Sequence, residues 1–348
     1  METVAILIPS LKKGGAEKQA VLLKNALSSN YKILFILFNA ELGCEEELLK
    51  LGDFKDNTLI KIQGRLIKKI LRLHQILRKN RVKYLFTYLT APNFYGSIIG
   101  RLAGVELIFT GIRNAYLENN KMCFEKLASK LATKVISNNH MGEKMLNQHG
   151  IKNTCTIPNC YTNLHVVPQK KRKECIDIIT VARFTEQKDY LTALKAIKEI
   201  HEDGLNVYYT IIGYGTLERQ IREWIKELNI ENIVNIIINP HNIFGYLEKQ
   251  DIYLSTSLYE GTSNSIMEAM DAELPIVATD VGDNKYLVIE GENGYIHKTG
   301  DIKNISASLK QLAQSYELRE RFGQYGKSLL KKNHSMIRFK QSYIDLLK

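Results

Sequence analysis

The stretch that decides the fold class is residues 176–212, IDIITVARFTEQKDYLTALKAIKEIHEDGLNVYYTII. Its two ends, Ile176–Val181 and Val207–Ile212, are apolar runs of strand length that are rich in β-branched residues. Between them, Tyr190–Glu202 carries apolar residues at helical spacing. Near-continuous apolar strands that alternate with helices indicate a parallel sheet covered on both faces.

The same alternation extends over the rest of the chain. Near the N-terminus, strands are predicted at Val4–Pro9 and Lys32–Phe38, with a helix at Ala16–Ser28 between them. A polar stretch with two prolines and a basic cluster, Pro158–Lys173, interrupts the pattern before it resumes. We therefore predict an α/β protein with two doubly wound parallel-sheet domains, whose ligands bind at the carboxyl ends of strands and in the interdomain cleft.

Length and composition agree with this organisation. The chain has 348 residues, enough for two α/β domains, and its 45% hydrophobic and 24% charged residues are typical of a globular protein that buries real cores. Five cysteines without a Cys-x-x-Cys pair suggest neither a zinc site nor a disulfide framework. No signal peptide or membrane span is expected from the sequence, so we predict a cytoplasmic protein.

The net charge of +11 is unevenly distributed. Residues 1–165 hold 24 basic and 12 acidic residues, whereas residues 166–348 hold 24 and 25. Eight basic residues and no acidic one occur in Gly64–Tyr84, where the apolar spacing predicts a basic amphipathic helix. Three interpretations remain open: a solvated surface helix with its apolar stripe buried on the sheet, a surface that binds anionic lipid, and a nucleic-acid site, for which the expected interleaved aromatic residues are missing.

Two glycine-containing loops lie between a predicted strand and a predicted helix. Gly213 and Gly215 are placed where the backbone could approach a phosphate, although Glu218 occupies the third glycine position of a dinucleotide fingerprint. A tight turn capped by Thr216 explains this loop equally well. Gly14 and Gly15 form a similar loop after the first strand, without the pattern of a nucleotide-triphosphate loop.

The richest segment is EGTSNSIME, residues 260–268, at the start of a predicted helix. Glu260 and Glu268 could accept hydroxyl hydrogens of a polyol while helix N-terminal amides hold an anion, or Ser265 and Glu268 could simply form a capping box. Arg183 and Lys188 follow the first strand of the second domain, where they could clamp a diphosphate or be ordinary surface charges. The small polar residues in the segment are Gly261, Thr262, Ser263, Asn264 and Ser265.

Taken in order, these motifs resemble the retaining glycosyltransferases of family 4, which have the GT-B fold of two facing Rossmann-like domains. The matching segments are Gly14-Gly15-Ala16-Glu17, Ile157-Pro158-Asn159, Arg183 with Lys188, Gly213-x-Gly215, and Glu260-x7-Glu268. The resemblance implies an N-terminal acceptor-side domain over residues 1–165 and a C-terminal nucleotide-sugar domain over 166–334. Residues 335–348 are expected to form a helix that packs back on the N-terminal domain.

The resemblance also implies roles for single residues. Glu260 would contact the transferred sugar and Glu268 the ribose of the nucleotide, while amides around Asn264 and Ser265 would hold the diphosphate. Arg183 and Lys188 would neutralise the leaving phosphate. Neither a metal nor another cofactor is expected, and no Asp-x-Asp motif occurs. A histidine that many members carry near the sugar is missing here, and Asn93, Arg113 and Asn114 are the candidates for acceptor or sugar contacts.

The expected function is therefore transfer of one sugar, with retention, from a nucleoside-diphosphate sugar of the UDP type. The expected acceptor is a glycan of a lipopolysaccharide, O-antigen or capsule, or one linked to polyprenyl diphosphate. The basic first domain would hold the enzyme at the anionic inner face of the cell membrane, and nucleic acid is not an expected partner. The alternatives are a non-hydrolysing UDP-sugar epimerase and a nucleotide-sugar-binding protein without catalysis.

Overall fold

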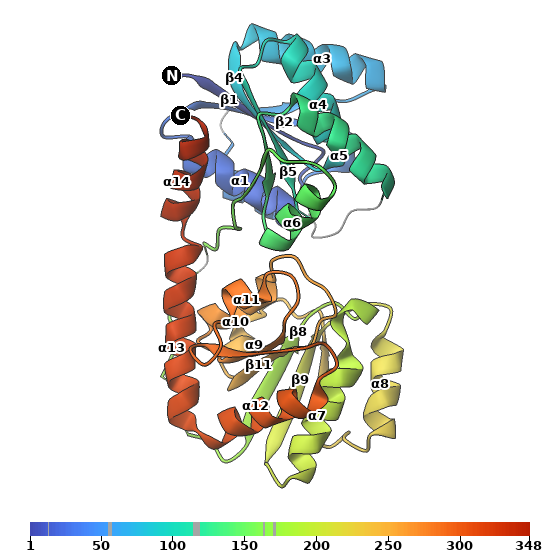
Figure 1. The fold of residues 1–348 in the computed structure, drawn as a ribbon, viewed down its shortest axis with the longest axis vertical. Helices are drawn as coiled ribbons and strands as arrows, with labels where there is room; N and C mark the ends of the chain where they lie inside the picture. Colours follow the sequence, from blue (N-terminus) through green and yellow to red (C-terminus); the bar gives the residue numbers. More distant parts are fainter. Residues whose placement is uncertain (13, 55–57, 114–118, 163, 170–171) are drawn as a thin grey trace. The chain divides into compact units, whose positions relative to one another are not determined.

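The computed structural model describes residues 1–12, 14–54, 58–113, 119–162, 164–169 and 172–348. The chain divides into two compact units (Figure 1). The N-terminal unit comprises Met1–Cys160 together with His334–Lys348, and the C-terminal unit comprises Tyr161–Asn333. Each unit contains one sheet whose paired strands are parallel, so the predicted fold class of two doubly wound α/β domains is confirmed.

The sheet of the N-terminal unit has the strand order β3-β2-β1-β4-β5-β6-β7. The order reverses between β1 and β4, which is the topological switch point of a doubly wound sheet. All six residues of β1, TVAILI, are buried, as expected for a central strand covered on both faces. The strands are β1 (Thr3–Ile8), β2 (Lys32–Leu37), β3 (Leu59–Lys61), β4 (Val82–Tyr88), β5 (Leu107–Ile112), β6 (Lys134–Ser137) and β7 (Thr154–Thr156).

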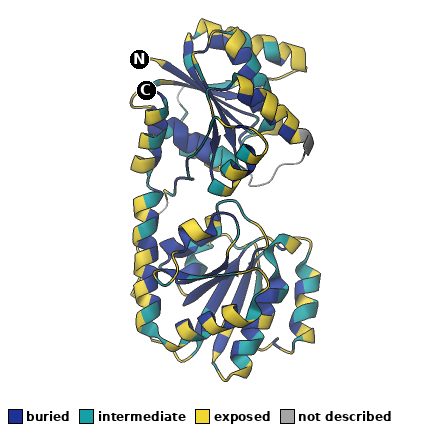
Figure 2. Cartoon of the chain, viewed as in Figure 1, coloured by how far each residue is buried: buried dark blue, intermediate teal, exposed yellow. Residues whose placement is uncertain are grey.

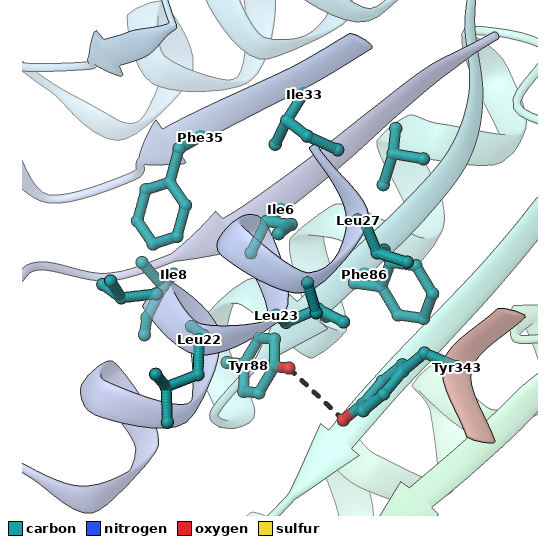
Figure 3. Close-up of a cluster of buried hydrophobic side chains, with 14 of the residues drawn as sticks. Ile6, Ile8, Leu22, Leu23, Leu27, Ile33, Phe35, Phe86, Tyr88 and Tyr343 are labelled. Carbon is teal, nitrogen blue, oxygen red and sulfur yellow. Dashed lines mark hydrogen bonds between the residues drawn. The ribbon is translucent and has the colours of Figure 1, made fainter. Parts of the chain in front are cut away.

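Helices cover both faces of this sheet and form two buried clusters. One cluster joins α1 and the C-terminal helix α14 to the sheet, and the other joins α3 and α4 to it. In the first cluster, Tyr343 of α14 packs against Phe86, and its hydroxyl lies 3.5 Å from that of Tyr88 (Figure 3). The helices are α1 (Gly15–Leu27), η1 (Ala40–Leu42), α2 (Glu46–Gly52), α3 (Leu66–Lys79), α4 (Thr90–Leu102), α5 (Asn119–Leu131), α6 (His140–Gln148) and α14 (Met336–Leu346).

The C-terminal unit repeats the arrangement with the strand order β10-β9-β8-β11-β12-β13. Ile176 of β8 pairs with Val207 of β9, and β11 lies on the other side of β8. The strands are β8 (Ile176–Val181), β9 (Val207–Gly213), β10 (Val234–Ile238), β11 (Ile252–Ser255), β12 (Ile276–Thr279) and β13 (Gly294–His297). The helices are η2 (Glu186–Lys188), α7 (Tyr190–Glu202), α8 (Glu218–Glu227), α9 (Phe244–Leu247), α10 (Asn264–Asp271), α11 (Asn284–Leu287), α12 (Ile302–Gln314) and α13 (Tyr316–Asn333).

The basic amphipathic helix corresponds to α3, but its apolar residues are not all buried. Leu73, Ile76 and Leu77 pack on the sheet, whereas Leu66, Ile67 and Leu71 are exposed, so the interpretation in which the whole apolar stripe is buried on the sheet is wrong. Figure 2 shows buried and exposed residues side by side along α3. Lys69 instead turns inward, and its ammonium group bonds to Asn39 Oδ1 at 2.6 Å and pairs with Glu41. Among the described residues, no helix is both long and apolar enough to cross a bilayer.

Candidate functional site

The predicted site residues of the C-terminal unit follow three neighbouring strands at the switch point of their sheet. Arg183 and Lys188 follow β8, Gly213 and Gly215 end β9 and begin the next loop, and residues 260–268 follow β11. Because the strands are parallel, their carboxyl ends lie at one edge, and β8 lies between β9 and β11. The sheet order therefore brings together loops that are separated by up to about 80 positions in the sequence.

An ion pair joins two of these loops. Lys188 Nζ pairs with Glu260 Oε1, and their side chains are only 13% and 10% exposed. Ser257 Oγ donates a hydrogen bond of 2.8 Å to the same carboxylate oxygen. Leu258 N also donates to Gln187 O at 2.8 Å, so backbone bonds fasten the two loops beside the pair. The result is a largely buried cation and anion held across the switch point, where a charged ligand of such a sheet is expected.

Gly213 and Gly215 allow the next loop to pack closely on the Arg183 loop. A Cβ atom at Gly213 would lie 1.9 Å from Ala182 O, and one at Gly215, whose φ is +151°, would lie 2.5 Å from Phe184 O. Phe184 N donates to Tyr214 O at 2.8 Å across this contact. Close packing of two loops therefore requires both glycines, whether or not a phosphate also binds there.

Thr216 is not the helix cap that one interpretation of this loop assumed. The N-cap residue of α8 is Leu217, and no side chain caps that helix end. Arg183 is exposed on the same edge of the sheet, and it forms no ion pair with any of the described residues. Its guanidinium group is therefore available to a ligand in solution.

Helix α10 begins two residues earlier than the predicted capping box requires. Its N-cap is Ser263, whose Oγ accepts a 3.4 Å hydrogen bond from Ile266 N. Ser265 consequently lies inside the first turn and Glu268 in the next one, so the interpretation as a Ser265–Glu268 capping box is wrong. The first-turn N–H groups of Asn264 and Ser265 have no acceptor within the helix and point out from its N-terminus.

Two residues that the sequence analysis did not assign support this segment. Tyr253 of β11 is buried beneath it, and its hydroxyl donates to Val181 O at 3.2 Å. Burial raises the pKa of Tyr253, and the carboxylates of Glu268 and Glu260 raise it further. Nothing in the alternating pattern of an ordinary buried strand distinguishes such a tyrosine in advance.

Gly282 is the second of these supporting residues. It has a φ of +56°, and a Cβ atom there would lie 2.4 Å from Glu260 O. Asp283 N donates to Gly261 O at 3.1 Å, and Thr279 Oγ1 donates to Ser257 O at 2.6 Å. The loop after β12 thus holds the backbone of Glu260 and Gly261 from the other side.

In the N-terminal unit, Arg113 lies near the carboxyl end of β5. Its Nη1 donates to Asn159 Oδ1 at 3.1 Å, and the guanidinium lies 4.7 Å from the centre of the Tyr88 ring. Its Nε and Nη2 atoms are buried and have no hydrogen-bond partner among the described residues. Gly14 is the N-cap residue of α1 and Gly15 its first residue. Asn114 lies outside the described residues.

Asn93 has a different environment from the one predicted for a substrate contact. Its side chain is fully buried, accepts from Thr87 Oγ1 at 2.7 Å, and donates to Gly111 O at 3.1 Å and to the carboxylate of Glu125. Both amide N–H groups and the amide oxygen therefore have partners that join α4 and α5 to the sheet, and with the side chain fully buried the predicted contact is corrected to a structural one. Burial raises the pKa of Glu125 to about 7.

Over the described ranges, no group of three or more histidine, cysteine, aspartate or glutamate side chains is placed to hold a metal ion. The charged groups that the structure assembles at the switch point are the cations and carboxylates named above.

Comparison with known proteins finds similar glycosyltransferases. Residues 164–329 match the family described as Glycosyl transferases group 1. An N-acetylgalactosamine-N,N'-diacetylbacillosaminyl-diphospho-undecaprenol 4-alpha-N-acetylgalactosaminyltransferase of Campylobacter jejuni is 23% identical over 95% of both chains. The amylovoran biosynthesis glycosyltransferase AmsK of Erwinia amylovora is 34% identical over 39% of this chain, and the match spans only 36% of AmsK. A match to an uncharacterized glycosyltransferase of Methanocaldococcus jannaschii likewise spans 40% of that relative.

Solved structures share the fold over the whole chain. Anabaena Alr3699/HepE in complex with UDP has a TM-score of 0.84 and 16% identity, and the match covers 100% of this chain and 99% of that one. The lipopolysaccharide outer core galactosyltransferase WaaB has a TM-score of 0.82 and 15% identity, with 99% of both chains covered. The predicted fold is thus confirmed: the chain has the GT-B fold, and its residues 164–329 match the Glycosyl transferases group 1 domain.

Proposed function

We propose that this protein is a glycosyltransferase that moves one sugar, with retention, from a UDP-sugar to a lipid-linked or lipopolysaccharide-type glycan. The observation that carries the proposal is the Lys188–Glu260 pair at the switch point, beside the open N-terminus of α10. The group 1 domain supports glycosyl transfer, and UDP is the ligand named for one structure of the same fold.

The charges at this edge suit a nucleoside diphosphate. Arg183 and Lys188 supply two cations, and the amides of Asn264 and Ser265 supply donors at the positive end of a helix dipole. Glu268 would accept hydrogen bonds from the ribose hydroxyls, and Glu260 would bind the transferred sugar. Because Lys188 already pairs with Glu260, an entering diphosphate would share this cation with the carboxylate.

The proposed reaction keeps the acceptor and the leaving group on the same face of the sugar. The bond between the anomeric carbon and the UDP oxygen breaks, and a bond from that carbon to the acceptor oxygen forms. The acceptor proton passes to the departing phosphate, so no protein base is needed. Arg183 and Lys188 stabilise the negative charge that grows on the diphosphate. We also propose that no metal ion or organic cofactor takes part.

The proposed acceptor is a glycan linked to polyprenyl diphosphate or belonging to a lipopolysaccharide, O-antigen or capsule. The Campylobacter relative is named for a diphospho-undecaprenol acceptor, and other relatives are named for amylovoran biosynthesis. The surplus of positive charge in residues 1–165 favours peripheral attachment at the inner face of the cell membrane.

The test is hydrolysis and transfer over a panel of UDP- and GDP-sugars, with and without a chelator. We expect UDP release from at least one UDP-sugar, unchanged by the chelator, and a product whose anomeric configuration matches the donor. Isomerisation of the donor without release of UDP would instead indicate an epimerase. Binding of UDP without release from any donor would indicate a non-catalytic protein.

A further inference from the structure

The N-terminal half of α3 exposes apolar side chains to solvent. Leu66, Ile67 and Leu71 are 45%, 74% and 59% exposed. Ile67 and Leu71 are four residues apart, so they lie on one face of the helix, one turn from each other. Exposed cations, Lys68 and Arg72, follow each of them in the sequence. Large apolar side chains in this position are costly in water unless something covers them.

A basic groove lies beside the C-terminal half of the same helix. It has a volume of about 960 Å³ and lies between α3 and the edge strand β3. Its lining combines apolar residues such as Leu34, Leu59 and Ile76 with basic and polar ones, and none of its lining residues is acidic. Four basic residues line it: Lys61, Arg72, Arg78 and Lys79. None of them forms an ion pair with the described residues of the chain.

Lys69 differs from these exposed cations because it is buried and has hydrogen-bond partners within the fold. It is the basic residue of α3 that is buried, and it has partners in Asn39 and Glu41. The exposed cations of α3 instead face solvent along its length, where they repel one another. An anionic surface would relieve that repulsion, and an apolar layer beneath it would cover Ile67 and Leu71.

From these two features we infer that α3 and the β3–α3 groove dock on an anionic lipid bilayer. Ile67 and Leu71 enter the boundary between headgroups and acyl chains, and Arg72, Arg78 and Lys79 bind lipid phosphates. Apolar residues flanked by cations on one helix are the pattern of an interfacial helix rather than of a nucleic-acid surface, which would use stacking aromatic residues.

The docking helix also has a defined place relative to the N-terminal sheet. Only four residues separate the end of β3 from Leu66, so the apolar end of α3 lies at the carboxyl edge of this sheet. Arg113 follows β5 at that same edge. A lipid-linked acceptor held in the bilayer would thus meet the edge where acceptor contacts are proposed, and in this respect the inference rests on the proposed function.

The test is cosedimentation of the full chain with phosphatidylcholine vesicles and with vesicles that contain phosphatidylglycerol. We expect the parent to bind the anionic vesicles about tenfold more tightly. Ile67→Glu combined with Leu71→Glu should lower this binding about tenfold. Ile337→Glu is the matched control, because Ile337 lies in the same unit and is 83% exposed.

The groove is tested with a charge-matched pair of variants. Arg78→Gln with Lys79→Gln should weaken binding to anionic vesicles several-fold, because each basic residue near an anionic bilayer contributes to the binding free energy. Lys331→Gln with Lys332→Gln, which removes two exposed cations from α13, should leave it unchanged. In high salt, the parent should retain part of its binding and the Ile67/Leu71 variant none, because apolar insertion is not screened.

Two results would overturn the inference: an Ile67/Leu71 variant that binds within twofold of the parent, or a parent that binds RNA but neither kind of vesicle. Thermal melts of every variant separate these results from misfolding. Hydrolysis of a UDP-sugar in solution is the independent readout of the proposed function. A parent without this hydrolysis contradicts glycosyl transfer but not docking, whereas normal hydrolysis without vesicle binding contradicts docking alone.

Discussion

At the scale of single residues, the switch-point site contains charged side chains that are fixed in place by ion pairing and hydrogen bonding. Lys188 and Glu260 form a largely buried ion pair, to which Ser257 donates a hydrogen bond, whereas Arg183 is exposed at the same edge. This arrangement suits a site in which Lys188 is positioned before the ligand binds and Arg183 contacts the ligand from the solvent side. Two carboxylates of this segment can be tested separately, since Glu260 has a cationic partner and Glu268 lies on the helix itself.

Glu260→Gln should lower turnover about 100-fold while leaving UDP affinity equal or higher. The amide keeps a hydrogen-bond acceptor for Ser257 but loses the charge that would stabilise the reacting sugar, and it frees Lys188 for the diphosphate. Steady-state kinetics and UDP titration measure the two effects. Glu186→Gln, at an exposed position of the neighbouring Arg183–Lys188 loop, should behave as the parent. A loss of UDP affinity equal to the loss of turnover would contradict the proposed role.

Glu268→Ala should weaken UDP binding by about 1.5–3 kcal/mol, because a charge-assisted hydrogen bond to the ribose would be lost. Calorimetric titration with UDP measures this change. Since Ser263 rather than Glu268 completes the cap of α10, we expect little change in the melting temperature. Glu292→Ala at an exposed turn serves as the control. A lower melting temperature with unchanged UDP affinity would assign Glu268 a structural role only.

At the scale of elements, the fold joins helices to sheets through a few buried polar groups as well as apolar packing. In the N-terminal unit, the amide of Asn93 in α4 donates a hydrogen bond to the carboxylate of Glu125 in α5. The same amide also donates to the backbone carbonyl of Gly111 in β5. Glu125 is almost completely buried, and the desolvation of its carboxylate raises its pKa to about 7. The contact of α4 with α5 therefore depends on protonation.

Stability of this contact should fall as the pH rises from about 4.5 to about 7. The folded state holds the proton of Glu125 more tightly than the unfolded state, so the folded state is favoured at low pH and loses this advantage as the carboxyl ionises. The difference amounts to about 3 kcal/mol. Denaturant unfolding at pH 5 and pH 8 measures it, and Glu125→Gln should flatten the dependence while keeping an acceptor for Asn93. An unchanged slope in this variant would contradict the assignment to Glu125.

At the scale of the whole molecule, the chain leaves the N-terminal unit after Cys160 and returns to it at His334. The last helix, α14, completes the first unit's core through Phe339, Tyr343 and Leu347. The N-terminal unit is thus built from both ends of the chain, while the C-terminal unit is continuous and carries the proposed nucleotide site. The two units should therefore respond to different perturbations.

Tyr343→Ala should lower the stability of the N-terminal unit by about 3–5 kcal/mol, because it removes a large aromatic side chain from the core around Phe86. UDP should instead raise the unfolding transition of the C-terminal unit by mass action. Scanning calorimetry with and without UDP resolves the two effects. Tyr343→Phe, which removes only the hydroxyl near Tyr88, should cost much less. If the calorimetric scan shows one transition whose midpoint responds both to Tyr343→Ala and to UDP, the two units unfold together.

The sequence by itself determined the two α/β units, because near-continuous apolar strands and amphipathic helices are local patterns with defined periods. Strands β1, β2, β8 and β9 and helices α1 and α7 lie within one residue of their predicted bounds. Strands β3 and β7, of three residues each, were not predicted, since so short a run has no measurable period. The family motifs were likewise readable, because their glycines and charges occur in a fixed order.

Only the tertiary structure decided which of those residues meet and which are buried. The pairing of Lys188 with Glu260 depends on β8 and β11 being neighbours, and the assignment of Ser263 rather than Ser265 as the cap depends on where α10 begins. In the same way, the burial of Asn93 and the exposure of Ile67 follow from contacts between elements that are remote in sequence. Periodicity names the apolar side of a helix, but how much of that side is covered depends on the neighbours that pack against it.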